Sequence, residues 1–310
     1  MKDNYGREIH YLRISVTQRC NLNCAYCGAA KPDAGELSPA DFARLAAGFA
    51  AVGIDKIRLT GGEPLVRDDI CEITRLVKAA AAPKTLGVTT NGLLLAEKAE
   101  ELLLSGVNAV NVSLDSLDRS CYRQLTGRDA LTPVLDGIEK ALSLGFRRVR
   151  INAVLLRGVN EKGADRLIEL AKDMPLDVRF IELMPFSDVG ESERMRIRSD
   201  EILARFPFLL PTGETDGTAV YYAAPGFKGK IGMISPISKK FCNACNRVRL
   251  LCNGRVKPCL GHPETYDLMP YIDDPEQLET AIREAILKKP AGHHFETDKN
   301  HTHALNRIGG

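Results

Sequence analysis

Short apolar segments typical of β-strands alternate with helix-like segments along the N-terminal part of the chain. The strand-like segments are rich in Val, Ile, Leu and Thr, as buried strands are. They cover Tyr11 to Val16, Lys56 to Thr60, Thr85 to Thr89, Ala109 to Leu114, Val149 to Leu155 and Val178 to Leu183. Regular alternation of this kind predicts parallel strands joined by right-handed helical crossovers.

Two of the intervening helices carry clear boundary signals. The segment from Ser38 to Ala51 opens with a Ser-Pro pair, which suits the N-cap and the first helical position, and the segment from Glu97 to Leu104 ends before Gly106. Six units, fewer than the eight of a closed barrel, favour an α/β fold built as an incomplete (β/α)6 TIM-type barrel. A doubly wound open sheet has nearly the same local pattern and stays open as an alternative.

After about Arg205 the alternation gives way to sequence punctuated by Pro and Gly. We therefore expect the barrel to cover residues 1–212 and a smaller C-terminal region to cover residues 213–310, with the boundary near Pro211 to Thr218. A chain of 310 residues is long enough for one α/β barrel with such an appendage.

Three cysteines, Cys20, Cys24 and Cys27, follow the first strand-like segment. They lie at the C-terminal end of that strand, where the active sites of α/β folds gather. Three soft thiolates suit an iron–sulfur cluster with one open iron, because a fourth would complete the coordination. Structural zinc requires four N or S ligands, no further Cys or His lies nearby downstream, and His10 could serve only by folding back.

A second cysteine group comprises Cys242, Cys245 and Cys259. Here His262 or Cys252 could complete a four-ligand set. By local spacing alone, zinc and an iron–sulfur cluster are therefore about equal alternatives.

Arginines and lysines recur within the strand-like segments, where charges are rare unless they are paired or face a functional lumen. Arg247 and Arg249 alternate along one segment and project to the same face, where two guanidiniums match phosphate oxygens. The other cations are Arg13, Lys56, Arg58, Arg150 and Arg179. We expect a lumen that binds a polyanion such as a triphosphate. A solvated edge strand and pairing with carboxylates are the alternatives.

Small polar loops follow three of the strands. They are Thr60-Gly-Gly-Glu-Pro64, Thr89-Thr-Asn-Gly92 and Ser113-Leu-Asp-Ser116. A single Gly-Gly turn is common in ordinary βα loops. Their coincidence at the C-terminal ends of strands predicts one shared polar pocket.

The bulk composition excludes several classes of function. A net charge of +2 gives no broad basic field for nucleic acid, and apolar runs such as Leu45 to Ile54 are far shorter than a membrane span. The N-terminus lacks the apolar core of a signal peptide, so we expect a cytoplasmic protein with reduced thiols. Nine cysteines at uneven spacing argue against a disulfide framework.

Taken together, these motifs resemble the radical S-adenosylmethionine (SAM) enzymes, and most closely those that cyclise GTP in molybdenum cofactor biosynthesis. The resemblance covers nearly the whole chain. It is carried by the first cysteine triplet, the Gly61-Gly-Glu-Pro64 turn, the second cysteine group with its arginine pair, and the tail Gly309-Gly310. The first triplet alone identifies only the superfamily. At Arg150 the family usually has lysine, and Gly-Ala follows Cys27 where it usually has Met-Pro.

The resemblance implies a four-iron four-sulfur cluster at each end of the barrel, which makes the C-terminal region a cluster-binding region. Three cysteines would hold each cluster: Cys20, Cys24 and Cys27 the first, and Cys242, Cys245 and Cys259 the second. The open iron of the first would chelate SAM. The side chains and glycines around that cofactor would be Tyr26, Gly61, Gly62, Thr89, Ser113 and Met184. The resulting 5′-deoxyadenosyl radical would take hydrogen from C3′ of GTP, and the ribose radical would close on C8 to give 3′,8-cyclo-7,8-dihydroguanosine 5′-triphosphate.

The resemblance also assigns the substrate contacts. The second cluster would hold guanine, and the seven cations would bind the triphosphate: Arg13, Lys56, Arg58, Arg150, Arg179, Arg247 and Arg249. The tail Gly309-Gly310 would enter the site, and the first triplet, Arg247, Arg249 and these glycines are expected to be needed for catalysis. The implied partners are an electron donor such as flavodoxin or ferredoxin and a downstream cyclic pyranopterin monophosphate synthase. A homodimer is compatible with this pattern, and neither nucleic acid nor a membrane is expected.

Two other functions compete with this interpretation. One is another radical SAM enzyme with an auxiliary cluster acting on a peptide, although such enzymes usually carry a longer cysteine-rich C-terminal module. The other is a zinc-stabilised binding protein, which has no need for a charged lumen. The histidines His293, His294, His301 and His303 invite a metal site, but a solvated linker is the expected structure.

Overall fold

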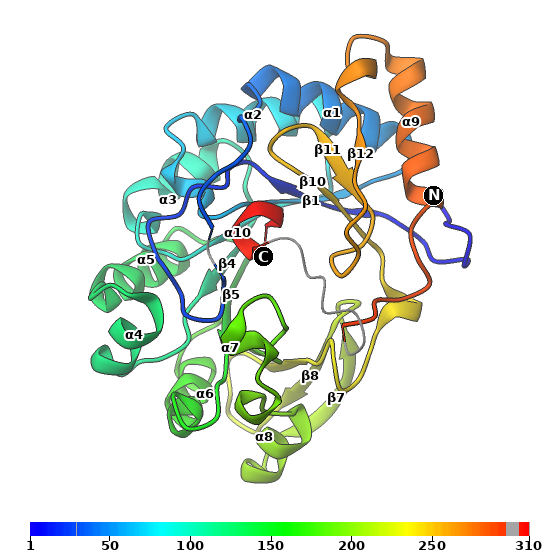
Figure 1. Ribbon diagram of the computed structural model, residues 1–310. Coiled ribbons are helices and arrows are strands. Elements are labelled where there is room, and N and C mark those ends of the chain that lie inside the picture. The colour runs from blue at the N-terminus through cyan, green and yellow to red at the C-terminus, as the bar shows by residue number, and fades with distance from the viewer. Residues whose placement is uncertain (29, 296–303, 310) are drawn as a thin grey trace.

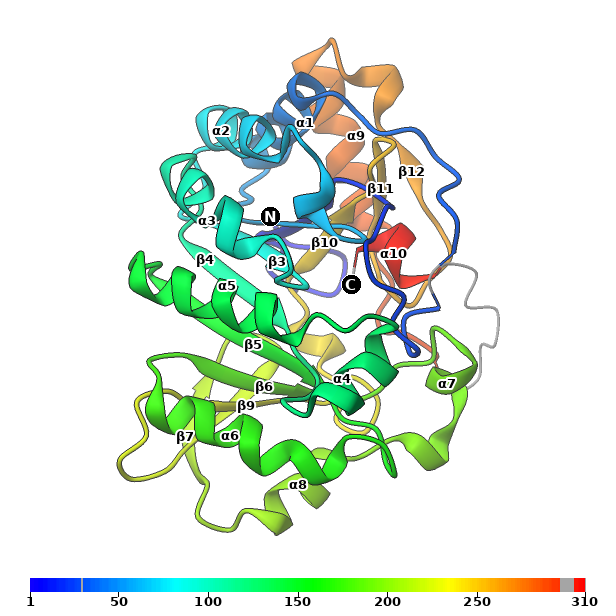
Figure 2. The same ribbon diagram turned by 90° about the vertical axis from the view of Figure 1, so that its left-hand side faces the viewer.

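The computed structural model describes residues 1–28, 30–295 and 304–309. Its centre is one sheet in which the described strands follow the order β12-β11-β10-β1-β2-β3-β4-β5-β6-β9-β8-β7. Figures 1 and 2 show this sheet curving around a central space, with helices α1 to α6 along its outer side. The predicted incomplete α/β barrel is confirmed, because β12 and β7 end the sheet and do not pair with each other.

Six strand–helix units build most of the barrel wall. The strands are β1 (Tyr11–Ser15), β2 (Lys56–Thr60), β3 (Thr85–Thr90), β4 (Ala109–Ser113), β5 (Arg148–Val154) and β6 (Asp177–Ile181). The helices are α1 (Pro39–Ala51), α2 (Ile70–Ala81), α3 (Leu95–Leu104), α4 (Arg119–Thr126), α5 (Leu131–Ser143) and α6 (Ala164–Asp173). Each predicted strand agrees with an observed one to within one or two residues at its ends.

The C-terminal region extends this wall at both ends. Its strands are β7 (Leu210–Thr215), β8 (Ala219–Ala223), β9 (Ile231–Ile234), β10 (Arg247–Leu250), β11 (Arg255–Lys257) and β12 (Tyr266–Asp267). Helices α7 (Asp188–Glu191) and α8 (Ser199–Arg205) lie between β6 and β7, before residue 213, and the helices of the C-terminal region are α9 (Pro275–Leu287) and α10 (Leu305–Ile308). Strand β10 pairs in parallel with β1, and β9 pairs in parallel with β6. The sheet continues across residue 212, and the domain boundary expected there stays a prediction.

Each barrel strand has one apolar face and one polar face. In β1, Leu12 and Ile14 are fully buried in the main hydrophobic core, whereas Tyr11 and Arg13 line a central cavity. Alternation along the strand explains this division, because successive side chains point to opposite faces of a sheet. The apolar half provides the stability of the wall, and the polar half is left to form the lumen.

Helix α1 begins where its sequence signals predict. Ser38 is the N-cap, its side chain accepts the backbone N–H of Asp41 at 3.2 Å, and Pro39 takes the first helical position. Helix α3 begins at Leu95, two residues before the predicted Glu97. Among the described residues, no helix is long and apolar enough to cross a membrane.

The contact between α1 and α9 fastens the C-terminal region to the outside of the barrel. Gly48 of α1 is buried against Leu278 and Ile282 of α9. A Cβ atom at Gly48 would lie 2.8 Å from Leu278 Cδ2 and 2.9 Å from Ile282 Cδ1. Because both neighbours are themselves buried in the core, they have little room to move away.

We therefore expect Gly48→Ala to destabilise the protein, although alanine is normally the better helix former. Overpacking of this kind costs about 1–3 kcal/mol, which thermal unfolding measured by calorimetry would detect as a lower midpoint. The matched control is Gly163→Ala, since nothing lies within 4 Å of the added atom there. Equal midpoints for the two variants would contradict the close α1–α9 contact.

Candidate active site

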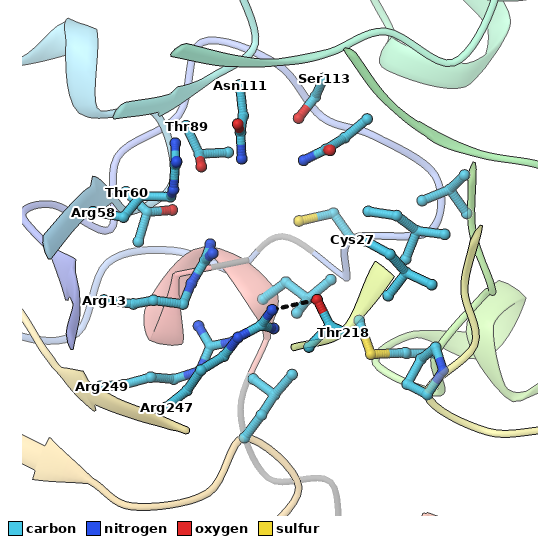
Figure 3. A pocket seen from close by; sticks show the side chains of 18 of the residues that line it. Arg13, Cys27, Arg58, Thr60, Thr89, Asn111, Ser113, Thr218, Arg247 and Arg249 are labelled. Atoms are coloured by element: carbon cyan, nitrogen blue, oxygen red, sulfur yellow. Dashed lines mark hydrogen bonds between the residues drawn. The ribbon is translucent and has the colours of Figure 1, made fainter. Parts of the chain in front are cut away.

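The lumen of the barrel contains a cavity of about 310 Å³. Figure 3 shows polar side chains from several strands converging on it. With the exception of the tail glycines, every site residue predicted from the sequence lines this cavity. These residues are Arg13, Cys20, Cys24, Tyr26, Cys27, Lys56, Arg58, Gly61, Gly62, Thr89, Ser113, Arg150, Arg179, Met184, Cys242, Cys245, Arg247, Arg249 and Cys259.

The loop that carries the first cysteine triplet is tied to the barrel wall on the side of α4 and β5. Its backbone N–H at Ala25 donates to the carbonyl of Leu125 at 2.9 Å. The Tyr26 hydroxyl donates to Asp115 Oδ2 at 2.7 Å, and Asp115 Oδ1 accepts the N–H of Val154 at 2.8 Å. Asp115 therefore positions the aromatic residue beside the third cysteine.

The glycine turn after β2 packs directly against the start of the cysteine loop. The N–H of Gly62 donates to the carbonyl of Thr17, and the N–H of Glu63 donates to the carbonyl of Arg19, both at 2.8 Å. A Cβ atom at Gly61 would lie 2.4 Å from the Thr17 carbonyl oxygen, and one at Gly62 would lie 2.3 Å from that of Arg19. Both glycines are required because two backbone segments touch here, and the turn is thereby fixed beside the cysteines.

Glu63 joins the loops that follow β2 and β3. Its carboxylate accepts the N–H of Leu65 at 3.0 Å, the Thr90 hydroxyl at 2.7 Å and the N–H of Asn91 at 2.6 Å. Burial raises the pKa of Glu63 to about 7, although these three donors favour the charged form.

The second cysteine group gathers beside β10. Cys242 begins a single helical turn before this strand, Cys245 follows that turn directly, and Cys259 follows β11. The buried ammonium of Lys289 links the two segments, because its Nζ donates to the carbonyl oxygens of Arg247 at 2.8 Å and Pro258 at 2.6 Å. Although burial opposes ionisation, Lys289 and Arg247 lower the pKa of the Cys245 thiol.

The two alternative ligands for this group lie elsewhere. Cys252 is buried outside the cavity lining, and the His262 ring is 2.9 Å from Glu264. In the described parts of the chain, no three His, Cys, Asp or Glu side chains are arranged to hold a single metal ion.

All six cysteines that line the cavity are free thiols. They form two groups of three, one from the loop after β1 and one around β10. Three thiolates per group are the donor set of a cluster with one open iron, so the residues present fit two such clusters.

Cations form rows across the wall between these groups. The strand register sets Arg249, Arg13 and Arg58 side by side on β10, β1 and β2, and Figure 3 shows them pointing into the cavity. Arg150 and Arg179 lie on the neighbouring strands β5 and β6. The predicted cationic lumen is therefore observed.

Tyr11 lies within this group of cations. Arg58 Nε donates to its hydroxyl at 2.9 Å, and Lys56 Nζ and the Arg247 guanidinium lie 4.4 Å and 5.5 Å from its ring centre. Burial alone would raise the pKa of Tyr11, but Arg58, Arg13 and Arg247 outweigh it and lower the value to about 6. The phenol acts as a partial counter-charge for the cations.

A carboxylate partly neutralises the other side of the lumen. Asp216, from the β7–β8 turn, lies 3.4 Å from Arg150 and 3.2 Å from Arg179. Although burial opposes ionisation, Arg179 and Arg150 hold its pKa well below the usual range. Arg179 also donates twice to Asn152 Oδ1, at 2.9 Å and 2.7 Å.

The cations around β1 and β10 destabilise one another. Burial, together with the nearby charges of Arg13 and Arg247, holds the pKa of Arg249 well below its usual value. Burial is also the main cause that lowers the pKa of Arg13 to about 10, and it lowers the pKa of Lys56. A polyanion bound among them would remove this repulsion, so the geometry favours a ligand with several negative charges.

The C-terminal segment reaches the same cavity. The carbonyl of Gly309 accepts a hydrogen bond from Arg249, the N–H of Leu305 donates to the carbonyl of Cys27 at 3.2 Å, and Asn306 donates to the carbonyl of Gln18 at 3.0 Å. The tail thus contacts both the first cysteine loop and Arg249 of the arginine pair. The predicted role of Gly310 falls outside the described residues, as do His301 and His303.

Several lining residues escaped the sequence analysis. They are Tyr11, Asn111, Asn152, Asp216, Lys289 and Asn306. Their positions at every second residue of a barrel strand could have identified the three on β1, β4 and β5. The other three depend on how the C-terminal region folds back, for which the local sequence carries no signal.

Comparison with known families agrees with this geometry. The family model "Radical SAM superfamily" matches residues 14–171, and "Molybdenum Cofactor Synthesis C" matches residues 176–295. The crystal structure of Streptococcus suis SuiB bound to S-adenosylmethionine superposes with a TM-score of 0.64 over 93% of this chain and 73% of that chain. At 17% identity this likeness supports the fold alone. The chain belongs to the radical SAM superfamily.

Similar proteins of known name indicate which family within the superfamily the chain belongs to. The GTP 3′,8-cyclase of Alkaliphilus oremlandii is 40% identical over all of both chains, and that of Desulforamulus reducens is also 40% identical over all of both. The GTP 3′,8-cyclase of Clostridium botulinum is 39% identical, again over both full lengths. Full-length similarity of this degree places the chain within the GTP 3′,8-cyclase family of enzymes. Membership of the superfamily implies a four-iron four-sulfur cluster and SAM as cofactors.

The raised pKa of Glu63 predicts a pH-dependent stability. Because the pKa is higher in the folded protein than in the unfolded chain, the stability that protonated Glu63 contributes is lost as pH rises through about 7. Between pH 5 and pH 8 (roughly the span that brackets this pKa), the wild type should lose stability relative to Glu63→Gln in urea unfolding. The exposed Glu139→Gln is the control and should track the wild type. A constant difference between wild type and Glu63→Gln would contradict the raised pKa.

Proposed function

We propose that this chain converts GTP to 3′,8-cyclo-7,8-dihydroguanosine 5′-triphosphate, the first step of molybdenum cofactor biosynthesis, using SAM and two four-iron four-sulfur clusters. The single observation that carries this proposal is one cavity lined by two groups of three thiols and by seven cations that the barrel strands carry. The names of the full-length relatives support the same reaction.

In this proposal, Cys20, Cys24 and Cys27 hold the first cluster, and Cys242, Cys245 and Cys259 hold the second. When bound, the first cluster and SAM supply the radical chemistry that removes hydrogen from the ribose. The groups assigned to SAM are the Gly61-Gly62 turn with Tyr26, Thr89, Ser113 and Met184. They come from the loops and strand ends nearest the first cysteine loop, which fits a cofactor bound there.

The cations of the lumen bind the triphosphate in this proposal. Arg13, Arg58 and Arg249 form one row, and Lys56 and Arg247 flank Tyr11 beside it. Arg150 and Arg179 are held by Asp216 until the ligand arrives. The tail contributes by holding Arg249 through the carbonyl of Gly309.

Further parts of the proposal concern the protein's surroundings. A one-electron donor such as flavodoxin or ferredoxin would reduce the first cluster, and a cyclic pyranopterin monophosphate synthase would consume the product. We retain a cytoplasmic location, the homodimer and the division at residues 1–212 and 213–310 as parts of the same proposal.

The decisive experiment measures iron and sulfide in the anaerobically reconstituted protein and then analyses products with GTP, SAM and dithionite. About eight irons, as two four-iron clusters require, together with the cyclised triphosphate and 5′-deoxyadenosine, are expected. Zinc in place of iron would overturn the proposal. About four irons with SAM cleavage and no GTP-derived product would indicate another radical SAM reaction.

Arg247→Ala tests the assignment of the arginine pair. Loss of a buried charge-assisted contact to phosphate should weaken GTP binding by about 100-fold, as measured by calorimetry, since such contacts are worth about 1.5–3 kcal/mol. Cleavage of SAM without GTP should persist, because Arg247 lies outside the first cysteine loop. The control is Arg255→Ala on β11, whose side chain bonds Thr265 outside the cavity. Unchanged GTP affinity in Arg247→Ala would remove the arginine pair from the substrate site.

A further inference from the structure

Asn111 is a buried amide whose acceptor oxygen has no hydrogen-bond partner in the described part of the chain. It lies on the lumen face of β4, where the register sets it between Thr89 of β3 and Arg150 of β5. Its residue is only 4% exposed, and its Oδ1 has no hydrogen-bond partner among the described residues. Figure 3 shows the side chain directed into the cavity between Thr89 and Ser113.

Asn152 is a nearby amide whose acceptor oxygen is hydrogen-bonded within the protein, and it serves as a comparison for Asn111. Asn152, on the lumen face of β5, accepts two hydrogen bonds from Arg179. Asn111 has no such arginine, although Arg150 is its register neighbour, because Arg150 pairs with Asp177 and Asp216. Leaving a buried acceptor unpaired costs free energy, so an amide kept in this state indicates a ligand that completes it.

The chemistry of the position defines the ligand group. Phosphate oxygens accept hydrogen bonds but cannot donate one to Oδ1, whereas a hydroxyl both donates and accepts. The Thr89 hydroxyl beside Asn111 is also buried, and none of the residues that the structure describes forms a hydrogen bond with it. Two neutral hydrogen-bonding groups next to a cationic row fit the sugar of a nucleotide whose phosphates occupy that row.

We propose that Asn111 hydrogen-bonds a ribose hydroxyl of the bound nucleotide and makes the site select ribonucleotides over deoxyribonucleotides. This inference rests on the proposed function, since it requires that GTP binds in the cavity. SAM also carries a ribose. Asn111 is the register neighbour of Arg150, which is assigned to the triphosphate, and this favours the nucleotide as the source of the hydroxyl.

The test compares the affinities of GTP, 2′-deoxyGTP and 3′-deoxyGTP for the reconstituted full-length protein by calorimetry. The wild type should bind GTP about 10-fold or more tightly than the analogue that lacks the recognised hydroxyl, as a lost hydrogen bond in a buried site predicts. The Asn111→Ala variant should bind GTP only as tightly as the wild type binds this analogue. The affinity for the analogue itself should differ by less than about threefold between the variant and the wild type. The GTP-to-GDP ratio should stay at the wild-type value, because the phosphate contacts are untouched.

Two further variants keep this result interpretable. Asn108→Ala changes the same residue type just before β4, outside the cavity, and should leave all affinities unchanged. Asn111→Ser retains a small hydrogen-bonding group and should keep part of the discrimination if Asn111→Ala unfolds.

Other outcomes would overturn the inference. Equal weakening of GTP and both deoxy analogues would assign Asn111 to packing of the wall. If Asn111→Ala still distinguished GTP from the deoxy analogues as the wild type does but bound SAM more weakly, Asn111 would be assigned to the ribose of SAM. A wild-type protein that binds none of the three nucleotides would instead refute the proposed function itself.

Discussion

Mutual repulsion among buried cations is the constraint around which this cavity is organised. Arg13, Arg58 and Arg249 lie in one register row, and burial together with the neighbouring charges lowers the pKa of Arg13 and Arg249. Strands tolerate this arrangement because their opposite faces, such as Leu12 and Ile14, are fully packed against helices. Packing of the apolar core therefore offsets the free-energy cost of burying several positive charges close together. A bound polyanion lowers that cost.

Neither part of the chain can form this site alone. The first cysteine loop follows β1, whereas the second group surrounds β10, and the two strands are direct neighbours in the sheet. The β7–β8 turn supplies Asp216 to Arg150 and Arg179, and the tail reaches the first loop through Asn306. The C-terminal region is thus a structural part of the lumen as well as the source of the second group of three thiols.

The sequence predicted the barrel wall well because a buried parallel strand is a local pattern. Strands β1 to β6 and the cap at Ser38 were readable from a few residues each. The positions of β9 and β10 beside β6 and β1 were not, since both strands pair with partners far away in the sequence and such pairing leaves no local trace. Asn111 was overlooked because asparagine disfavours strands, although its spacing of two residues from Ser113 places both on the same face of β4.

Strands β10 and β9 of the C-terminal region cover the edges of β1 and β6, and this pairing has a consequence for the synthesis of the protein. While the chain emerges from the ribosome, β1 and β6 present unpaired edges until β10 and β9 have been made. Exposed edges of this kind recruit other strands and promote aggregation. Pairing over such sequence separation also slows folding. Production of this enzyme should therefore respond to chaperone supply and growth temperature more strongly than its packed core alone would indicate.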